Sequence, residues 1–460
     1  MQRDSIDFGV MNVGQLFRKQ LFPTIMGMVA AALFTVVDGI FVGNGIGSDA
    51  IAAVNISAPI FMIITGVGLM FGMGGGILAS INLSKGKLKV ANINLTQSVI
   101  ALVIVSLIMT SLFTAFPRKI AMLFGSDEYL LDMVAEYLFW FSISLPFTVL
   151  VVALPFFIRL SNPKVSMWAM LVATLINIVL DYLFIFVFKW GLFGAALATD
   201  IGELAGAVIM LAYLFRRSLV VRFARLKVSI KSMMLTLRNV GYMVRLGSSV
   251  FLSEITLSIM IIAGNYVFMH YLGANGVATY SVICYLFPII FMVFNATVQS
   301  AQPIISYNYG CGQMERSNKA LRLAISFAAV FAIAVTILFM CSAKSIVTLF
   351  IPDVSSMSWQ YAVSGLPLFA IDYLFFGINV IMIGYYTSIE RIRRAMMLTV
   401  LRGILPVMFF FTLPLWLGVT GIWLAVAAGD VTITLVIALL LLRDSVYKNG
   451  SADRPYKQTM

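Results

Sequence analysis

Long apolar runs are the feature that most constrains the fold of this chain. They extend over about twenty residues or more, the length of helix that crosses a hydrocarbon core about 30 Å thick. Hydrophobic residues make up 61% of the 460 residues and charged residues only 11%, too few to cover the surface of a soluble protein of this size. The sequence therefore predicts an all-α polytopic membrane protein and excludes a large soluble core.

Polar turns between the apolar runs divide the chain into twelve predicted membrane-spanning helices. Several spans are longer than a bilayer requires, so tilted or kinked helices are expected. The predicted spans are 15–41, 50–78, 92–116, 129–155, 165–187, 191–215, 242–269, 277–303, 318–341, 359–388, 394–416 and 419–442.

The basic residues give the predicted orientation, because Lys and Arg are concentrated on the cytoplasmic side of membrane proteins. Twelve spans place only Arg118, Lys119, Lys189 and Lys344 on the side away from the termini, which leaves 27 of the 31 basic residues on the side of the termini. Both termini are therefore predicted to be cytoplasmic, in a multi-pass protein of the cell (inner) membrane. The net charge of +12 is interpreted as this topology signal, with contacts to membrane lipids rather than to nucleic acid.

The two halves of the chain repeat local patterns at a fixed shift. The matching pairs, 226 or 227 positions apart, are Asn82 and Asn308, Gly86 and Gly312, Asn92 and Asn318, Gly191 and Gly418, and Gly194 and Gly421. Each repeat holds six predicted helices, so the repeats are parallel, and two such lobes around a central cleft suit alternating access. We expect an N-terminal lobe at 1–215, a basic cytoplasmic linker at 216–241, a C-terminal lobe at 242–442 and a cytoplasmic tail at 443–460.

Polar residues deep in the N-terminal apolar runs are candidates for a cation site. Asp38 lies in the first predicted helix, while Asn177 and Asp181, like Thr199 and Glu203, are four residues apart and share a helix face. A charge at mid-bilayer costs about 2.5–3.5 kcal/mol, so such residues usually face a cavity. Convergent oxygen atoms would suit a hard cation such as Na⁺, and a carboxyl group in an apolar cavity could carry H⁺. The alternative interpretation is hydrogen bonding between helices.

The C-terminal half has two comparable acidic candidates, Glu254 and Asp372, whose alternative role is internal pairing. Asp200 is a weaker candidate because it points about 100° away from Thr199 on a helix, and Asp430 is also weaker. His270 is the sole histidine and the three cysteines are far apart, so neither a catalytic set nor a zinc or disulfide framework is indicated. The sequence thus predicts no enzyme and no cofactor.

Two stretches resemble signatures of the multidrug and toxic compound extrusion (MATE) family. Residues 37–43, Val-Asp-Gly-Ile-Phe-Val-Gly, look like that family's first-helix signature. Residues 302–310, Gln-Pro-Ile-Ile-Ser-Tyr-Asn-Tyr-Gly, look like its more specific C-lobe signature. The resemblance implies export of organic cations and amphipathic drugs in exchange for Na⁺ or H⁺, by a protein that is expected to be a monomer.

The same resemblance implies site residues in both lobes. Four residues match the family's N-lobe cation site in type and spacing and would be the Na⁺ ligands under sodium coupling: Asp38, Asn177, Asp181 and Thr199. Glu254 and Asp372 look like the C-lobe acids of the NorM-like subgroup. Glu203 and Gln302 are secondary candidates, and Glu203 departs from the uncharged residue that the family pattern implies. The coupling ion, Na⁺ or H⁺, and the lobe that binds it both stay open.

Four other functions remain as alternatives. The first is a lipid-linked oligosaccharide flippase of related architecture, whose relatives tend to have fourteen helices or a basic cavity. The second is a facilitator-type transporter, whose loop between helices 2 and 3 typically has an Asp–Arg pair; this chain has Ser84–Lys89 there instead. A membrane-embedded enzyme would need a catalytic constellation, and an ion channel would pass current without exchange of substrate.

Overall fold

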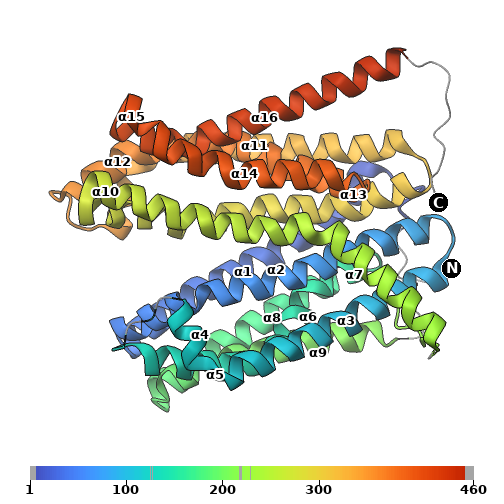
Figure 1. Ribbon diagram of the computed structural model, residues 1–460, viewed down its shortest axis with the longest axis horizontal. Coiled ribbons are helices and arrows are strands. Elements are labelled where there is room, and N and C mark those ends of the chain that lie inside the picture. Colours follow the sequence, from blue (N-terminus) through green and yellow to red (C-terminus); the bar gives the residue numbers. More distant parts are fainter. Residues whose placement is uncertain (1–6, 125, 127, 217–219, 228, 451–460) are drawn as a thin grey trace. The chain divides into compact units, whose positions relative to one another are not determined.

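The computed structural model describes residues 7–124, 126, 128–216, 220–227 and 229–450, and all regular structure in these residues is helical. Among these described residues, ten helices are long and apolar enough to cross a membrane. The number rises to twelve when each of two bent helix pairs is counted as one span. The predicted all-α polytopic fold is confirmed, with a span for each predicted helix (Figure 1).

The helices are distributed over both halves of the chain. The first half contains α1 (Val13–Gly45), α2 (Ser48–Ser84), α3 (Leu88–Ala115), α4 (Pro117–Leu123), α5 (Leu131–Ile143), α6 (Leu145–Ala153), α7 (Pro155–Ile158), α8 (Pro163–Asp181), the π-helix η1 (Tyr182–Val187) and α9 (Gly191–Leu214). The second half contains α10 (Ile230–Gly310), α11 (Met314–Phe350), α12 (Met357–Ala370), α13 (Asp372–Ser388), α14 (Ile392–Thr412), α15 (Pro414–Leu417) and α16 (Val419–Gly450). α10 holds two spans that are joined at Gly273, where the backbone leaves the helical conformation.

Capping residues explain why many of the helices extend beyond the predicted spans. The side chain of Asn12 accepts a hydrogen bond from the backbone N–H of Gly14, at 2.8 Å, so α1 begins before its apolar run. Ser229 caps α10 through Ser232, and α10 therefore includes residues 230–241 of the predicted linker. Such caps satisfy N–H groups that the first turn leaves without partners.

Two predicted spans are bent. The span formed by α5 and by residues 145–158 bends by 58°, and the span formed by α12 and α13 bends by 43°. The first bend coincides with Pro146 in the first turn of α6, which has no backbone N–H to continue the hydrogen bonds of α5. The second bend places Asp372 at the first residue of α13, next to the N–H groups of a helix start.

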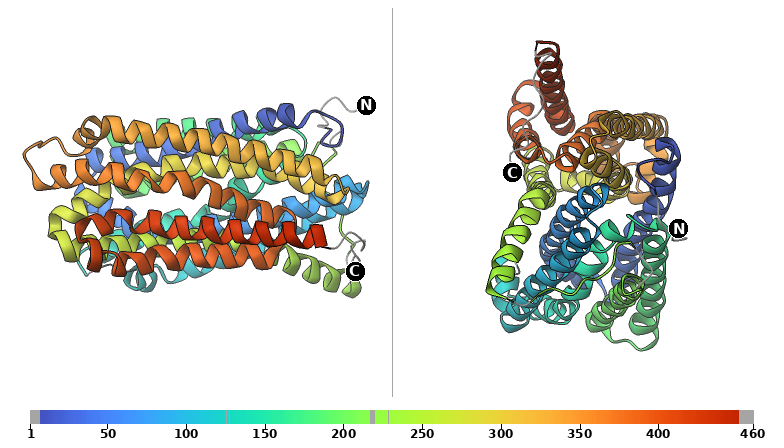
Figure 2. Two further views of the ribbon diagram at one scale, coloured as in Figure 1. Left: turned by 90° about the horizontal axis from the view of Figure 1, so that it is seen from above. Right: turned by 90° about the vertical axis from the view of Figure 1, so that its right-hand side faces the viewer.

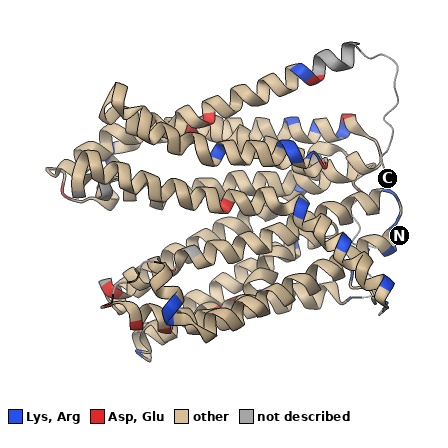
Figure 3. Ribbon diagram, in the orientation of Figure 1, with Lys and Arg blue, Asp and Glu red and all other residues tan. Residues whose placement is uncertain are grey.

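The described residues form two compact units, which we treat separately. Unit 1 comprises Met1–Ile259, Cys284–Ala328 and Ile383–Val400, and unit 2 comprises Met260–Ile283, Ala329–Met382 and Leu401–Met460. These units do not follow the predicted lobe boundaries, which remain a prediction. Within unit 1, α8 packs against both α1 and α9 (Figure 2). Lys and Arg residues of unit 1 gather at the end of this bundle where α3 begins (Figure 3).

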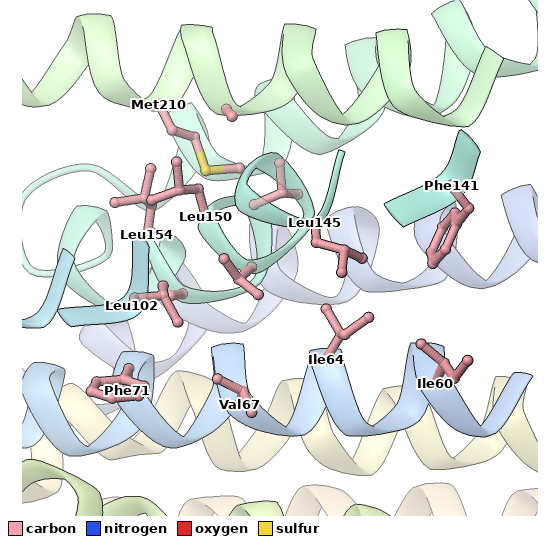
Figure 4. Packing of buried hydrophobic residues seen from close by; sticks show 14 of the residues in the cluster. Ile60, Ile64, Val67, Phe71, Leu102, Phe141, Leu145, Leu150, Leu154 and Met210 are labelled. Atoms are coloured by element: carbon pink, nitrogen blue, oxygen red, sulfur yellow. The ribbon is translucent and has the colours of Figure 1, made fainter. Parts of the chain in front are cut away.

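The core of unit 1 is built around α2. Its buried residues Ile60, Ile64 and Val67 pack in one cluster with Leu145 and Leu150 of α6 (Figure 4). Interdigitated apolar side chains of this kind exclude voids, so the position of each helix is fixed by its neighbours. α9, which carries some of the polar residues described below, packs against both α5 and α6.

Small residues let α2 approach its neighbours closely. A Cβ atom added to Gly72 would lie 2.8 Å from the Cα atom of Ala153 in α6, and one added to Gly68 would lie 3.2 Å from the backbone oxygen of Val149. Real Cβ atoms do not approach that closely without displacement. The glycine stripe of α2 therefore serves packing, as small residues do at helix interfaces in membranes.

The backbone repeats at the same shift as the sequence. Six described glycines have positive φ, and they form three pairs: Gly47 with Gly273, Gly86 with Gly312, and Gly191 with Gly418. The φ angles of the second pair are 71° and 80°, and those of the third pair are 61° and 58°. Equivalent turns thus need the conformation that glycine tolerates best, which agrees with the two related halves.

Candidate functional site

Three neighbouring helices of unit 1 carry the predicted N-lobe cation residues. Asp38 lies on α1, Asn177 and Asp181 lie on α8, and Thr199 lies on α9. α8 packs between the other two helices (Figures 1 and 2). Residues that are up to 161 positions apart in the sequence, Asp38 and Thr199, are therefore brought into one bundle.

A hydrogen bond links the α8 and α9 parts of this group. The side-chain amide of Asn177 donates to the hydroxyl of Thr199 at 3.4 Å, and that hydroxyl donates to the backbone oxygen of Ala195 at 3.2 Å. Asn177 and Thr199 are both buried, with 2% and 5% of their surface exposed. This bond fixes the orientation of the Asn177 amide. Its oxygen atom, Oδ1, is buried and accepts no hydrogen bond from the described residues.

The carboxylates of Asp38 and Asp181 lie close enough to interact electrostatically. Asp181 is fully buried and the Asn177 side chain interacts with its carboxylate, although neither carboxylate oxygen has a hydrogen-bond partner at normal distance among the described residues. The Oδ1 atom of Asp38 is buried and is also without a partner in the described part of the chain. Buried polar atoms are nearly always hydrogen-bonded in proteins. These unused oxygen atoms are therefore suited to a proton or a cation.

Two further acids belong to the same bundle. Asp200 and Glu203 of α9 interact electrostatically, and each has one buried carboxylate oxygen without a hydrogen-bond partner in the described residues. The ion pair found in the described part of the chain, Arg118 with Asp132, involves neither of them and is exposed. Four acidic side chains thus share one region without an arginine or lysine paired to them. Uncompensated acids in an apolar environment attract cations strongly.

Tyr137 of α5 completes this acidic cluster, which we define as Asp38, Asp181, Asp200, Glu203 and Tyr137. The phenol of Tyr137 is buried near Asp38, Asp200 and Asp181. Its ring stacks on Phe141, with centroids 5.9 Å apart. Sequence reasoning missed Tyr137, because its span has no spacing pattern that ties it to the acids, and only the packing of α5 against α9 shows the connection.

A small cavity opens beside the acidic cluster. Its volume is about 40 Å³, and its walls include Ala31, Phe34, Asn177, Thr199 and Glu203. A water molecule needs roughly 10–15 Å³ of such volume, so about three waters, or a cation with part of its hydration shell, would fit. Pockets for drug-sized molecules are roughly 300–1,000 Å³. This cavity therefore suits a small ion and excludes a drug.

The helix changes its winding immediately after Asp181. The six-residue π-helix η1 begins at Tyr182, and π-helical turns are rare and often occur at functional sites. The ring of Phe186 in η1 packs edge-on against Phe41 of α1, with centroids 5.6 Å apart. This contact links the end of α8 to the turn of α1 that follows Asp38. The apolar sequence of residues 182–187 gives no signal for this change of winding.

The two C-lobe candidates lie in different units. Glu254 of unit 1 is half-buried on α10, and its Cβ atom lies 3.6 Å from the place of a Cβ added to Gly66 of α2. Asp372 of unit 2 is fully buried and interacts with Asp430 and Arg402. The weaker sequence candidate Asp430 is thus a direct neighbour of the stronger one.

Hydrogen bonds fix the position of Asp430 in unit 2. The side-chain amide of Asn379 donates to the Oδ1 atom of Asp430 at 2.9 Å, and the hydroxyl of Thr434 donates to the amide oxygen of Asn379 at the same distance. Asp372 and Asp430 form a second buried acidic pair, in which Asn379 is the hydrogen-bond partner of Asp430. Arg402 supplies a positive charge there, which distinguishes this pair from the acidic cluster of unit 1.

Gln302 has a local structural explanation. Its side-chain amide donates to the hydroxyl of Ser306, one turn later on α10, at 3.3 Å. Both residues are buried in unit 1. Within the described residues, no three His, Cys, Asp or Glu side chains gather at metal-binding distance. A bound Na⁺ would therefore need amide, hydroxyl, backbone or water oxygens in addition to carboxylates.

Comparisons with known proteins agree with this architecture. A family model described as MatE matches residues 23–183 and again residues 250–412, so its two matches begin 227 positions apart. The chain is 26% identical over 332 residues to the multidrug export protein MepA of Staphylococcus aureus (strain NCTC 8325 / PS 47), covering 72% of each chain. The MepA of Staphylococcus saprophyticus is 25% identical over 342 residues, which cover 73% of this chain and 74% of that protein.

Solved structures share the fold over almost the whole chain. A MATE in the bent conformation superposes with a TM-score of 0.85 at 22% identity, covering 96% of this chain and 98% of that one. An outward-facing multidrug resistance MATE family transporter of the MOP superfamily also gives a TM-score of 0.85, at 21% identity, covering 95% of this chain and 97% of that one. At these identities the structural similarity establishes the fold alone.

Proposed function

Because this chain belongs to the MatE family of membrane transporters, we propose that it is a secondary active antiporter that exports organic cations and amphipathic drugs in exchange for Na⁺ or H⁺. The similarity to the MepA multidrug export proteins supports drugs as the substrate class. Alternating access of two related halves would carry out the exchange.

The observation that carries this proposal is the acidic cluster of unit 1. Its carboxylates lie on α1, α8 and α9; each has at least one buried oxygen atom without a hydrogen-bond partner in the described residues, and none has a basic side chain paired to it there. A site that only joined helices would use its polar atoms for hydrogen bonds. Unused oxygen atoms instead fit reversible occupation by a small cation. Those of Asn177 and Glu203 belong to residues that line the cavity of about 40 Å³, whereas Asp38 and Asp181 are not among its lining residues.

The proposed mechanism is competition between two ligands that prefer different conformations. The coupling cation binds Asp38 and Asp181 and favours the conformation that releases drug to the outside. Cytoplasmic drug binds the inward-open conformation after the cation has left. Coupling requires only that each ligand bind one conformation better than the other. The bend next to Pro146 and the change of winding after Asp181 are places where helices around the cluster could adjust.

We further propose that both termini are cytoplasmic, that the protein resides in the cell membrane, and that one chain is sufficient for transport. The distribution of basic residues supports the orientation. The candidate residues of each site come from a single chain, which supports a functional monomer. A lipid-linked oligosaccharide flippase is not favoured, because the deep charges of unit 1 described above are mainly acidic whereas a pyrophosphate substrate needs basic groups.

Transport in liposomes tests this function. Purified protein would be reconstituted, and ethidium movement would be followed by fluorescence under an imposed Na⁺ gradient and, separately, under a pH gradient. Protein-free liposomes are the control. We expect one gradient to drive ethidium against its own concentration gradient, which would also identify the coupling ion. If neither gradient moves ethidium although the protein remains folded, drug export is wrong and a lipid-linked substrate becomes the function to test.

A further inference from the structure

A second and larger cavity in unit 1 shares no lining residue with the small cavity beside the acidic cluster. Its volume is about 770 Å³, and it lies where α3 begins, where α9 ends and where residues 222–225 pass between these helix ends. Three basic residues line it: Lys89, Arg222 and Arg225. No acidic residue is among those that line it in the described chain. The cavity therefore has the charge of a site for an anion.

The segment after α9 is held in place by its backbone. The N–H group of Arg222 donates to the side-chain oxygen of Asn92 at 2.9 Å, and the N–H group of Ala224 donates to the hydroxyl of Thr96 at 2.9 Å. Val221 is fully buried beside them. Two hydrogen bonds to α3 and one buried anchor therefore fix the backbone of the segment that carries Arg222 and Arg225 at the cavity.

One wall of the cavity is apolar. The rings of Phe215 and Phe223 pack together with centroids 4.8 Å apart, and both residues line the cavity. Phe215 is 67% exposed at the end of α9. An exposed aromatic ring next to basic side chains is typical of the interface between membrane and water, where one part of a site is apolar and the other is wet.

Exposed apolar side chains lead from the cavity along α3. Lys89 lies on the same helix face as Ile100, Ile104 and Leu107, since their spacings place them within about 60° of one another around a helix. The three apolar residues are each about half exposed. This face belongs to a span that is apolar enough to cross the membrane. It therefore provides a surface for acyl chains directly below a basic cavity.

We propose that this cavity binds the phosphate group of an anionic phospholipid, with Lys89, Arg222 and Arg225 around the headgroup and the acyl chains along the exposed face of α3. Charge-assisted hydrogen bonds from guanidinium and ammonium groups are the strongest that phosphate oxygens accept. The end of the bundle that holds these residues is the basic end, where anionic lipid of the cytoplasmic leaflet would be attracted. The site requires no drug or coupling ion, so it stands apart from the transport function proposed above.

Native mass spectrometry of the full-length protein in detergent tests this site. The protein would be titrated with phosphatidylglycerol, with phosphatidylcholine of the same acyl chains, and with sodium phosphate. The test variant replaces the three basic residues together: Lys89→Gln, Arg222→Gln and Arg225→Gln. The matched control removes three exposed basic residues outside the cavity: Lys231→Gln, Lys319→Gln and Arg322→Gln. Thermal unfolding of each variant shows whether it is folded.

We expect phosphatidylglycerol to bind the wild-type protein more tightly than phosphatidylcholine does. The test variant should bind phosphatidylglycerol about 100-fold more weakly than the wild type, because each basic residue near a charged surface contributes roughly fivefold to the affinity. The control variant should keep its affinity within about threefold. Equal losses in both variants would mean attraction by overall charge and would overturn the site. Equal affinity for inorganic phosphate would overturn the assignment to a lipid.

Discussion

At the residue scale, Asp181 of unit 1 is an acid in an unusual environment. It is fully buried, it interacts with Asp38, and its oxygens have no hydrogen-bond partner at normal distance among the described residues. We expect Asp181→Asn and Asp38→Asn each to weaken cation binding by roughly 10- to 100-fold, since interactions with a charged group are worth about 1.5–3 kcal/mol. Gradient-driven ethidium transport in liposomes would then fall to the rate of protein-free vesicles.

Asp353 offers a matched control for these variants. It is an exposed acid between α11 and α12, where the hydroxyl of Ser355 donates to its Oδ1 atom at 2.6 Å and the Ser355 N–H at 3.0 Å. These hydrogen bonds lower the pKa of the Asp353 carboxyl. Asn can accept both bonds, so Asp353→Asn should transport at the wild-type rate. A loss of transport in Asp353→Asn as large as in Asp181→Asn would remove the case for a specific acidic cluster.

Arg159 gives a prediction about stability in unit 1. Its side chain is 2% exposed, and its Nη1 atom donates to the Oε1 atom of Gln299 at 2.6 Å. Gln299→Leu leaves this buried charge without that acceptor, which should cost about 2–3 kcal/mol of unfolding free energy. The double variant Arg159→Met with Gln299→Leu should be closer to wild type, because it removes the charge as well.

Denaturant unfolding of both single variants and the double variant in detergent would measure this coupling. Additive losses in the double variant would show that the hydrogen bond contributes nothing, and that Arg159 and Gln299 stabilise unit 1 through separate contacts. The backbone oxygen of Arg159, which accepts from the Gln20 amide at 2.8 Å, is retained in every variant.

Residue types and helical spacing predicted part of the site. Asn177 and Asp181 share a face of α8, and the expected neighbourhood with Thr199 of α9 is present as a hydrogen bond. The roles of these residues stay predictions. By spacing alone Asp200 is a weaker candidate, because it points away from Thr199 around the helix, yet α5 and α6 pack against α9 and Asp200 lies near Tyr137. Spacing within one helix cannot show which neighbouring helix covers each face.

At the element scale, the close approach of α2 and α6 gives a prediction. A Cβ atom on Gly72 would meet the Cα atom of Ala153 at 2.8 Å and the Ala153 oxygen at 3.0 Å. Gly72→Ala should therefore lower stability by about 1–3 kcal/mol, as overpacking does. Gly241→Ala on α10 is the matched control, because a Cβ there meets nothing within 4 Å. Alanine also favours helix by up to about 1 kcal/mol over glycine.

Thermal unfolding in detergent, followed by tryptophan fluorescence, measures this difference. We expect Gly72→Ala to lower the Tm and Gly241→Ala to leave it unchanged or raise it. A Tm for Gly72→Ala at or above the wild-type value would show that α2 and α6 can move apart freely, and that this part of the glycine stripe does not set their distance.

Apolar run length predicted where the helices lie, because each run matches a bilayer-crossing helix. It did not predict the bend at α5–α6 or the π-helix after Asp181. Pro146 is a local signal for the bend, although Pro23, Pro288 and Pro303 lie inside helices that continue past them. The π-helix has no such signal, since residues 182–187 are uniformly apolar or aromatic. Its winding depends on packing against other helices rather than on residues 182–187 alone.

At the scale of the whole molecule, the two related halves were predictable from a few residues. Glycines matched at a shift of 226 or 227 adopt positive φ in pairs, such as Gly86 with Gly312 and Gly191 with Gly418. A turn that needs this conformation favours glycine, so the sequence similarity between the two halves is clearest at the turns.

Exchange of drug for a cation through the acidic cluster is the central claim, and reverse coupling tests it most directly. Liposomes with no ion gradient would be given an ethidium gradient, and the movement of the cation identified in the first assay would be recorded for wild type, Asp38→Asn and Asp353→Asn. Thermodynamic coupling is reciprocal, so ethidium flow should drive the cation in the opposite direction in wild type and Asp353→Asn but not in Asp38→Asn. Ethidium flow in the wild type without any cation movement would contradict the account.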